Sequence, residues 1–282
     1  MFTTDRRPTR PSAGFLVAEF DAVFRRRRNL VLLALVALVP VVIAVALRRS
    51  PGMTIDAGRP GVRLAHDAAS GAHVALAGLL GVMPFLLPLT VALVAGDAIA
   101  GEAQTGTLRY LLAVPVRRTR LLLTKYVALV GWCAAVAAAV TTSGAVAGFL
   151  LFPSRRVEVL SGRAVSWGDG LARLLLATGY VTVTLAALAA IGLFASTLTD
   201  APLAAVAATL SVAVAGQVVE TLPGLQALRP WLPTHYWSLF VDVLADGPAT
   251  PRLEHGLLAQ AGFAALFLAL AWAQFTGRDV TS

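Results

Sequence analysis

"RRRRNLVLLALVALVPVVIAVALRR", residues Arg25 to Arg49, decides the fold class of this chain. Its centre, Leu30 to Leu47, carries no charge, and roughly 20 apolar helical residues are needed to cross a hydrocarbon core about 30 Å thick. The apolar run is longer than that of a secretory signal, and no small-residue cleavage pattern follows it. The stretch therefore predicts a permanent membrane-spanning helix.

The rest of the chain repeats this pattern. Of its 282 residues, 57% are hydrophobic and 13% are charged, whereas about a quarter of the residues in soluble domains are charged. Uncharged apolar windows predict six spans, at 30–47, 73–95, 126–152, 171–195, 202–219 and 257–275. We therefore expect an all-α, polytopic membrane protein in which residues 30–282 form a six-span transmembrane domain.

The arginines before the first span set the expected orientation. Lys and Arg beside spans concentrate on the cytoplasmic side, and the densest cluster is Arg25, Arg26, Arg27 and Arg28. An even number of spans then places both termini in the cytoplasm. Abundant alanine and arginine with scarce lysine are typical of high-GC bacteria, so we expect a bacterial plasma-membrane protein. Arginines beside the spans also explain the net charge of +8, so no nucleic-acid partner is expected.

Residues 1–29 are predicted to be a cytoplasmic tail followed by an amphipathic helix. Leu16, Phe20, Val23 and Phe24 share one helical face, and the four arginines come directly after it. This pattern favours a helix at the inner membrane surface, with the arginines contacting anionic headgroups. A short helix packed on a soluble partner is the alternative.

A polar connector, residues 96–125, separates the second predicted span from the third. It carries five basic residues, and each would cost about 2.5–3.5 kcal/mol at the centre of a membrane helix. The connector is therefore expected in the cytoplasm. Gly106 can end one helix by adopting a positive φ, and Thr107 can cap the next. That second helix would present Leu108, Leu111 and Leu112 on one face, which requires a protein partner to cover it.

Two further connections restrict the fold. The turn 196–201 is so short that the fourth and fifth spans must be antiparallel neighbours. The loop 220–256 is apolar and aromatic, but Pro223, Pro230 and Pro233 prevent a spanning helix there. We expect short re-entrant or capping helices at the outer surface before the last span.

Catalytic and metal-binding patterns are missing from the sequence. The glycines of "GDAIAGEA" have the spacing of a phosphate-binding loop, but Glu102 stands where that loop needs lysine. The four histidines form no metal-ligand spacing, and the single cysteine, Cys133, lies inside a span. We therefore expect no catalytic residue, no metal and no cofactor in this chain, and a polytopic membrane enzyme is disfavoured.

The polar residues inside the spans allow two interpretations. Thr182, Thr184, Ser211 and Gln217 could line a translocation pathway, or they could form hydrogen bonds within and between helices. Glu220, at the outer end of the fifth span, could gate or bind a cationic group, or it could be a solvated carboxylate at a helix end.

The connector resembles the coupling region of ABC transporter permeases of type two, the exporter-like class. The matching pieces are Glu102, Gly106-Thr107-Leu108, Leu111-Leu112-Ala113, Pro115, Arg117-Arg118 and Lys125-Tyr126. The amphipathic N-terminal helix, the six spans and the aromatic loop before the last span extend this resemblance over nearly the whole chain. Arg117-Arg118 departs from the Ser-Arg pair that is common in the family.

The resemblance implies a permease subunit that exports an amphipathic drug, lipid or peptide by alternating access. It implies coupling contacts at Glu102, Gly106, Thr107, Leu108, Leu111 and Leu112, made to a separate ATPase subunit that binds ATP and Mg²⁺. It also implies a second permease subunit, the same or similar. The alternative function is a non-transporting membrane anchor that recruits a cytoplasmic protein.

Overall fold

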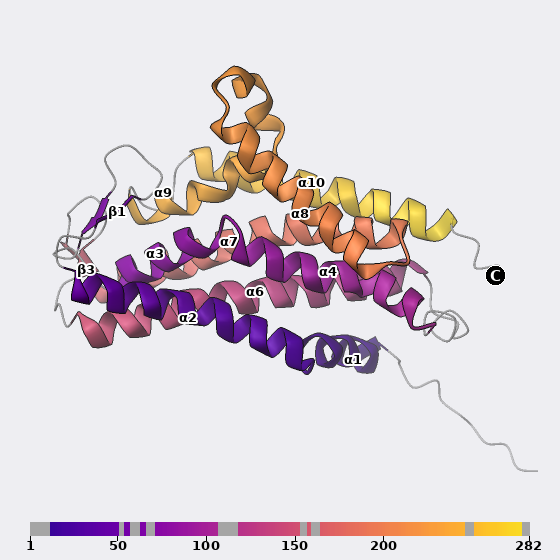
Figure 1. Cartoon of the computed structure of the whole chain (residues 1–282), viewed down its shortest axis with the longest axis horizontal. Coiled ribbons are helices and arrows are strands. Elements are labelled where there is room, and N and C mark those ends of the chain that lie inside the picture. The colour runs from indigo at the N-terminus through magenta and orange to yellow at the C-terminus, as the bar shows by residue number, and fades with distance from the viewer. Residues whose placement is uncertain are drawn as a thin grey trace, which may run out of the picture.

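A computed structural model describes residues 12–50, 54–56, 63–65, 71–106, 118–152, 157–158, 164–245 and 251–277 of the chain. Long helices run nearly along one axis and form a bundle (Figure 1). The α-helices are α1 (Ser12–Phe24), α2 (Arg27–Arg49), α3 (Gly71–Val82), α4 (Leu86–Gln104), α6 (Arg118–Leu151), α7 (Trp167–Leu198), α8 (Pro202–Thr221), α9 (Phe240–Ala245) and α10 (Pro251–Gly277).

Short elements occupy the connections. Two antiparallel strand pairs, β1 (Thr54–Asp56) with β2 (Arg63–Ala65) and β3 (Val157–Glu158) with β4 (Ala164–Val165), lie at one end of the bundle (Figure 1). We call this the hairpin end. The opposite end, where α4 stops and α6 begins, is the connector end. Helix α1 and the last turn of α10 also lie at the connector end (Figure 1).

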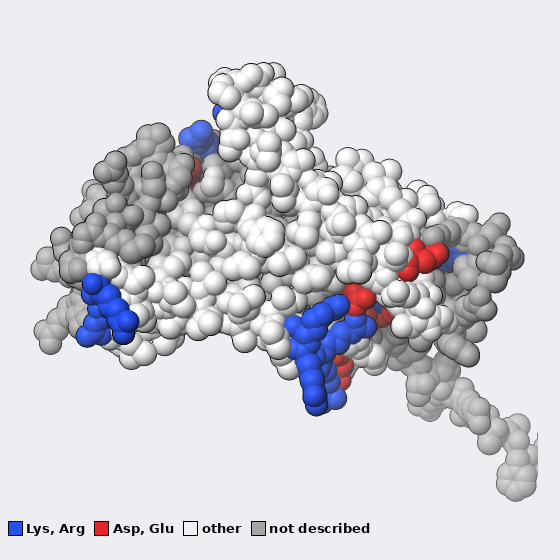
Figure 2. Space-filling model, in the orientation of Figure 1, with Lys and Arg blue, Asp and Glu red and all other residues white. Residues whose placement is uncertain are grey.

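The prediction of an all-α protein with six spans is confirmed. Six helices of the described chain are long and apolar enough to cross a membrane: α2, α4, α6, α7, α8 and α10. The 23 residues of α2 extend about 34 Å at 1.5 Å per residue, which matches a hydrocarbon core of about 30 Å. Figure 2 shows basic side chains over both ends of α2 and an uncharged surface between them. Leu38 and Val42 of α2 are exposed, as expected of a lipid-facing helix.

The second predicted span, 73–95, is wrong as one continuous helix. The chain forms α3, a turn at 83–85, and then α4, which continues nine residues beyond the predicted end to Gln104. Pro84 and Pro88 explain the break, because neither has a backbone N–H to donate to the preceding turn. In particular, Pro88 cannot donate a backbone hydrogen bond to the carbonyl of Pro84. That carbonyl instead accepts a 2.6 Å hydrogen bond from the Gln217 side chain of α8.

The connector is shorter than predicted. The range 96–125 contains the last nine residues of α4 and the first eight of α6, which leaves 105–117 between the two helices. Charged residues were predicted to keep this whole range outside the bundle. The helices accommodate them because the acidic and basic side chains pair with one another, as described below.

Small residues allow the helices to approach closely. A Cβ atom on Gly96 would lie 2.9 Å from the backbone nitrogen of Val206, so α4 and α8 touch at the backbone. A Cβ on Gly144 would lie 2.6 Å from the Cα of Ala75, which puts α6 directly against α3. The antiparallel packing of α7 on α8, predicted from the short turn, is also observed (Figure 1).

The proline-rich loop forms short helices, as predicted. They are the 3-10 helices η2 (Pro223–Trp231) and η3 (Pro233–Leu239), followed by α9. The η2 segment protrudes sideways from the bundle (Figure 1), and Trp231 on it is 78% exposed. By contrast, Trp237 on η3 is buried. The protrusion lies beside the bundle, so it does not cap the hairpin end.

The N-terminal helix packs its aromatic side chains on a span of its own chain. Phe20 of α1 lies against Gly131 of α6, and the ring of Phe24 contacts Trp132 edge-on, with centroids 5.7 Å apart. The apolar stripe of α1 therefore covers α6 of its own chain. Val17 is exposed on the same helix. A position at the membrane surface stays a prediction.

Candidate functional site

A lysine at the connector end is buried between two carboxylates. Lys125, in the second turn of α6, is 3% exposed. Its Nζ lies 3.0 Å from Oε1 of Glu19 on α1 and 2.5 Å from Oε1 of Glu102 on α4. A buried charge is stable only with such partners, because leaving one ion unpaired costs several kcal/mol. One ammonium group thus joins three helices.

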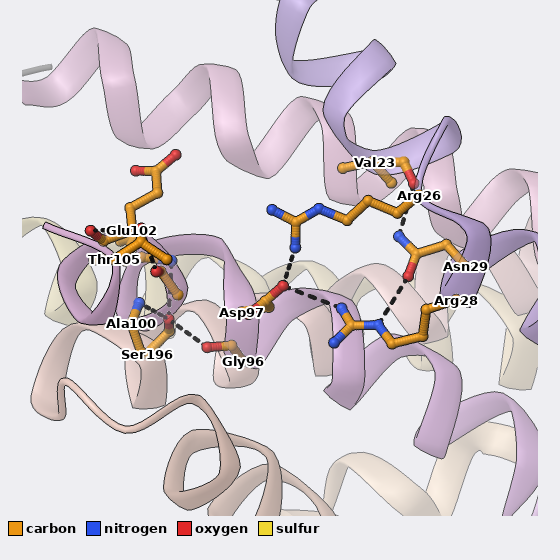
Figure 3. Close-up of polar contacts among 12 residues, drawn as sticks. Val23, Arg26, Arg28, Asn29, Gly96, Asp97, Ala100, Glu102, Thr105 and Ser196 are labelled. Atoms are coloured by element: carbon orange, nitrogen blue, oxygen red, sulfur yellow. Dashed lines mark hydrogen bonds and ion pairs between the residues drawn. The ribbon is translucent and has the colours of Figure 1, made fainter. Parts of the chain in front are cut away.

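A second set of ion pairs lies next to the first. Asp97 of α4 accepts hydrogen bonds from Arg26, in the link between α1 and α2, and from Arg28 in the first turn of α2 (Figure 3). Asn29 is buried and donates a 2.7 Å hydrogen bond to the carbonyl of Val23. The Asn29 hydrogen bond therefore fixes the corner between α1 and α2, and Asp97 attaches this corner to α4.

The far side of α4 is held by a serine of α7. Ser196 is fully buried, accepts hydrogen bonds from the amides of Ile99 and Ala100, and donates to the carbonyl of Gly96 (Figure 3). Ser196 contacts α4 at the same level as Asp97. The last turns of α4 are thus attached to α2 on one side and to α7 on the other.

The start of α6 is attached to the end of α10. Arg118, the first residue of α6, donates to the carbonyls of Phe275 and Thr276 at 3.1 and 3.0 Å. Cationic donors at a helix C-terminus satisfy its free carbonyls and oppose its dipole. The indole of Trp272 also donates to Thr119 at 2.9 Å. Both flanks of segment 107–117 are consequently anchored to several spans.

The two ends of that segment have defined geometry. Thr105 caps the last turn of α4 by donating to the carbonyl of Gly101 at 3.0 Å. Gly106 has a φ of +71°, as predicted, and turns the chain away from the helix axis. We refer to α4 from Asp97 to Gly106 and α6 from Arg118 to Lys125, with the pairs above, as the connector network.

The predicted coupling residues are only partly described. Glu102 is bound to Lys125, and Gly106 ends the helix, while Thr107, Leu108, Leu111 and Leu112 lie outside the described residues. The predicted membrane-surface arginines divide into two kinds. Arg25 and Arg27 are exposed, whereas Arg26 and Arg28 are half-exposed and bind Asp97.

The four predicted pathway residues have different surroundings. Thr182 and Thr184 donate to the carbonyls of Thr178 and Val181 within their own helix. Thr184 is fully buried, and Ser211 is exposed on α8. Gln217 of α8 donates a 2.6 Å hydrogen bond to the carbonyl of Pro84 at the break between α3 and α4. The hydrogen-bonding interpretation therefore accounts for both threonines, and a pathway role stays a prediction.

Sequence reasoning missed Glu19, Asp97 and Ser196. The sequence did contain a signal for the two acids. Each lies next to an apolar region, and arginine or lysine residues that could pair with it are nearby. No sequence signal separates Ser196 from the other hydroxyls of the spans. Within the described residues, no three His, Cys, Asp or Glu side chains gather as a metal site would require.

Comparison with known proteins agrees with this architecture. The family model of the ABC-2 family transporter protein matches residues 18–277. A probable ABC transporter permease protein, NosY, of Stutzerimonas stutzeri is 36% identical over 102 residues. That match spans 33% of this chain and 37% of NosY, so it covers about a third of either protein. The family is a membrane component and is distinct from the ATPase. Because the family model covers nearly all of the six-span bundle and the connector network, the chain belongs to the ABC-2 transporter family.

Proposed function

We propose that this chain is the permease subunit of an ATP-driven exporter and that a separate ATPase subunit docks on segment 107–117. Glu102, Gly106, Thr107, Leu108, Leu111 and Leu112 would form or support the contact. ATP and Mg²⁺ would bind to the partner, since the chain has no phosphate-binding lysine motif. Arg25, Arg26, Arg27 and Arg28 indicate that this side is cytoplasmic.

The observation that carries the proposal is the buried Lys125 between Glu19 and Glu102. Separating these groups would leave the buried Lys125 without its partners, at a cost of about 3–5 kcal/mol. Force applied to segment 107–117 would therefore move the ends of α4, α6 and α1 together. A passive loop would not need such connections on both flanks.

The remaining contacts would spread this motion through the bundle. Asp97 carries it to α2, Ser196 to α7 and Arg118 to α10. A second permease subunit, identical or similar, would complete the pathway between two such bundles. Rigid-body motion of packed helices around that interface would then alternate access to the substrate.

The test uses the complex of this chain with its ATPase subunit, reconstituted in lipid vesicles. Leu108→Ala removes a proposed contact, and Leu258→Ala is its matched control because Leu258 is exposed on α10, away from the connector. We expect Leu108→Ala to lower substrate-stimulated ATP turnover about tenfold and Leu258→Ala to leave it unchanged. Equal turnover in both variants would reject docking at this segment.

The same assay distinguishes the alternative function. A membrane anchor would bind the ATPase subunit, but ATP turnover would not drive any solute across the bilayer. Transport measured in sealed vesicles, with and without ATP, therefore separates a permease from an anchor.

A further inference from the structure

A pocket lies at the break between α3 and α4, well away from the connector network. Residues of three segments enclose it: Met83 and Pro84 at the break, Gln217 and Glu220 at the end of α8, and Trp237 on η3. Gly216 lets η3 approach α8, because a Cβ there would lie 2.5 Å from the hydroxyl oxygen of Thr234. The cavity measures about 230 Å³.

The pocket lies at the depth of the hydrocarbon core. Pro84 precedes Asp97 by 13 positions along the chain, which is about 20 Å at the rise of an α-helix. Asp97 pairs with arginines at the connector end, where the membrane surface is expected. A core of about 30 Å therefore places the pocket inside the half of the membrane that faces the hairpin end.

A carboxylate at this depth requires an explanation. Glu220 is about one-quarter exposed, and its Oε1 lies 3.0 Å from Nδ1 of His235. A neutral imidazole would give the carboxylate a hydrogen bond but no opposite charge. Among the described residues, no lysine or arginine lines the pocket. Ionisable groups in the membrane are costly, and those that persist usually serve a ligand or an ion.

The rest of the pocket lining is mostly apolar. Leu80, Met83 and Pro84 line it on the side of the helix break, and Glu220 is the one acidic side chain among the described residues that line it. A carboxylate in an apolar enclosure favours a ligand that carries the opposite charge.

We propose that this pocket binds the ammonium headgroup of a cationic amphiphile. Glu220 supplies the opposite charge, and the apolar lining beside it contacts the methyl or methylene groups. The cavity is smaller than the 300–1,000 Å³ typical of sites for whole drug-sized ligands, so it fits a headgroup only. The tail would leave past Phe85 and Val218, which are exposed to lipid.

This inference rests on the proposed function, because it names the substrate class of the exporter. Such a substrate enters sideways from the bilayer, which an opening at hydrocarbon depth permits. Its recognition is independent of the ATPase subunit, so binding and coupling can fail separately.

The test measures binding of radiolabelled dodecyltrimethylammonium to the full chain in lipid nanodiscs, with empty nanodiscs subtracted. Dodecanol, which has the same tail and no charge, is the comparison probe. Glu220→Gln removes the charge with little change in shape, and Glu254→Gln is the matched control because Glu254 is an exposed carboxylate in the first turn of α10.

We expect the wild-type chain to bind the cation at least tenfold more tightly than the alcohol. Glu220→Gln should abolish that preference, and Glu254→Gln should keep it. Equal affinity of the wild-type chain for both probes, or an unchanged preference in Glu220→Gln, would overturn the proposal.

A second measurement covers the case in which Glu220→Gln does not fold. A trimethylammonium probe with a photoreactive tail is crosslinked to the wild-type chain, and the labelled peptides are identified by mass spectrometry. Labelling near 83–85 and 217–222, competed by dodecyltrimethylammonium and not by dodecanol, supports the pocket; labelling elsewhere rejects it. If the wild-type chain does not bind the cation but ATP-driven coupling is intact, this inference alone is rejected; cation binding without coupling would reject only the proposed function.

Discussion

The connector end and the Glu220 pocket differ in how their charged side chains are paired. At the connector end, Lys125 and Asp97 each contact two oppositely charged side chains of the same protein. In the pocket, the described residues give Glu220 one histidine neighbour and no lysine or arginine. Ion pairs between helices make a stiff joint, whereas a carboxylate without a lysine or arginine partner keeps capacity for a cationic ligand. Mutations at the two places should therefore differ in kind, with stability affected most at the first.

The largest effect is expected for Lys125→Met. This change leaves Glu19 and Glu102 close together without the cation between them, and it should lower the free energy of unfolding by about 3 kcal/mol. Denaturant titration of the purified chain in mild detergent measures the loss. Arg120→Met is the control, because Arg120 is exposed one turn earlier on α6, and it should change stability by less than about 0.5 kcal/mol. Similar losses in both variants would mean that burial of Lys125 adds nothing.

Ser196→Ala should have the next largest effect. The alanine leaves the carbonyl of Gly96 and the amides of Ile99 and Ala100 without the hydroxyl, which should cost about 1–2 kcal/mol. Thr182→Val is a suitable comparison, since Thr182 bonds only within its own helix. If the two substitutions lower the free energy of unfolding equally, the contact of Ser196 with α4 contributes no more than a hydrogen bond within one helix.

Gly106→Ala tests the turn itself. A Cβ at a φ of +71° costs about 1 kcal/mol, and no neighbouring atom lies within 4 Å to add a clash. Gly106→Asn should cost less, because asparagine tolerates this conformation better. Stability is measured by thermal unfolding, and ATP turnover of the complex is measured in parallel. Better turnover with alanine than with asparagine would contradict a required left-handed turn.

The smallest effect concerns the helix break beside the pocket. Gln217→Leu removes the hydrogen bond to the Pro84 carbonyl, and polar contacts between membrane helices average about 0.6 kcal/mol. Pro88→Ala restores a backbone N–H that can satisfy the same carbonyl. Gln217→Leu should therefore cost less in the Pro88→Ala background, and a double-mutant cycle measures the difference. Strictly additive effects would show that the proline does not create the need for Gln217.

Much of the architecture could be predicted from the sequence. Long uncharged windows between arginines identify spans, because a bilayer excludes charge and demands a minimum helix length. The positive φ of Gly106 and the short helices after Pro223 followed from local backbone constraints. The break at Pro84 was missed because hydropathy is uniform across it, although the two prolines were visible in the sequence.

The candidate sites needed the tertiary structure. Glu19, Glu102 and Lys125 are far apart in the chain, and a charge pattern alone could not show that one lysine meets both acids. The same is true of Glu220, which the sequence left between a solvated helix end and a cation site. Only the folding of η3 onto α8 placed His235, Thr234 and Trp237 around it.

The sequence by itself thus determined that this chain spans a membrane, how many times, and where several of its helices end, because these features depend on local hydrophobicity and backbone geometry. The tertiary structure alone decided which charges pair with one another. Pairing depends on contacts between residues distant in sequence, and burial sets the strength of those contacts.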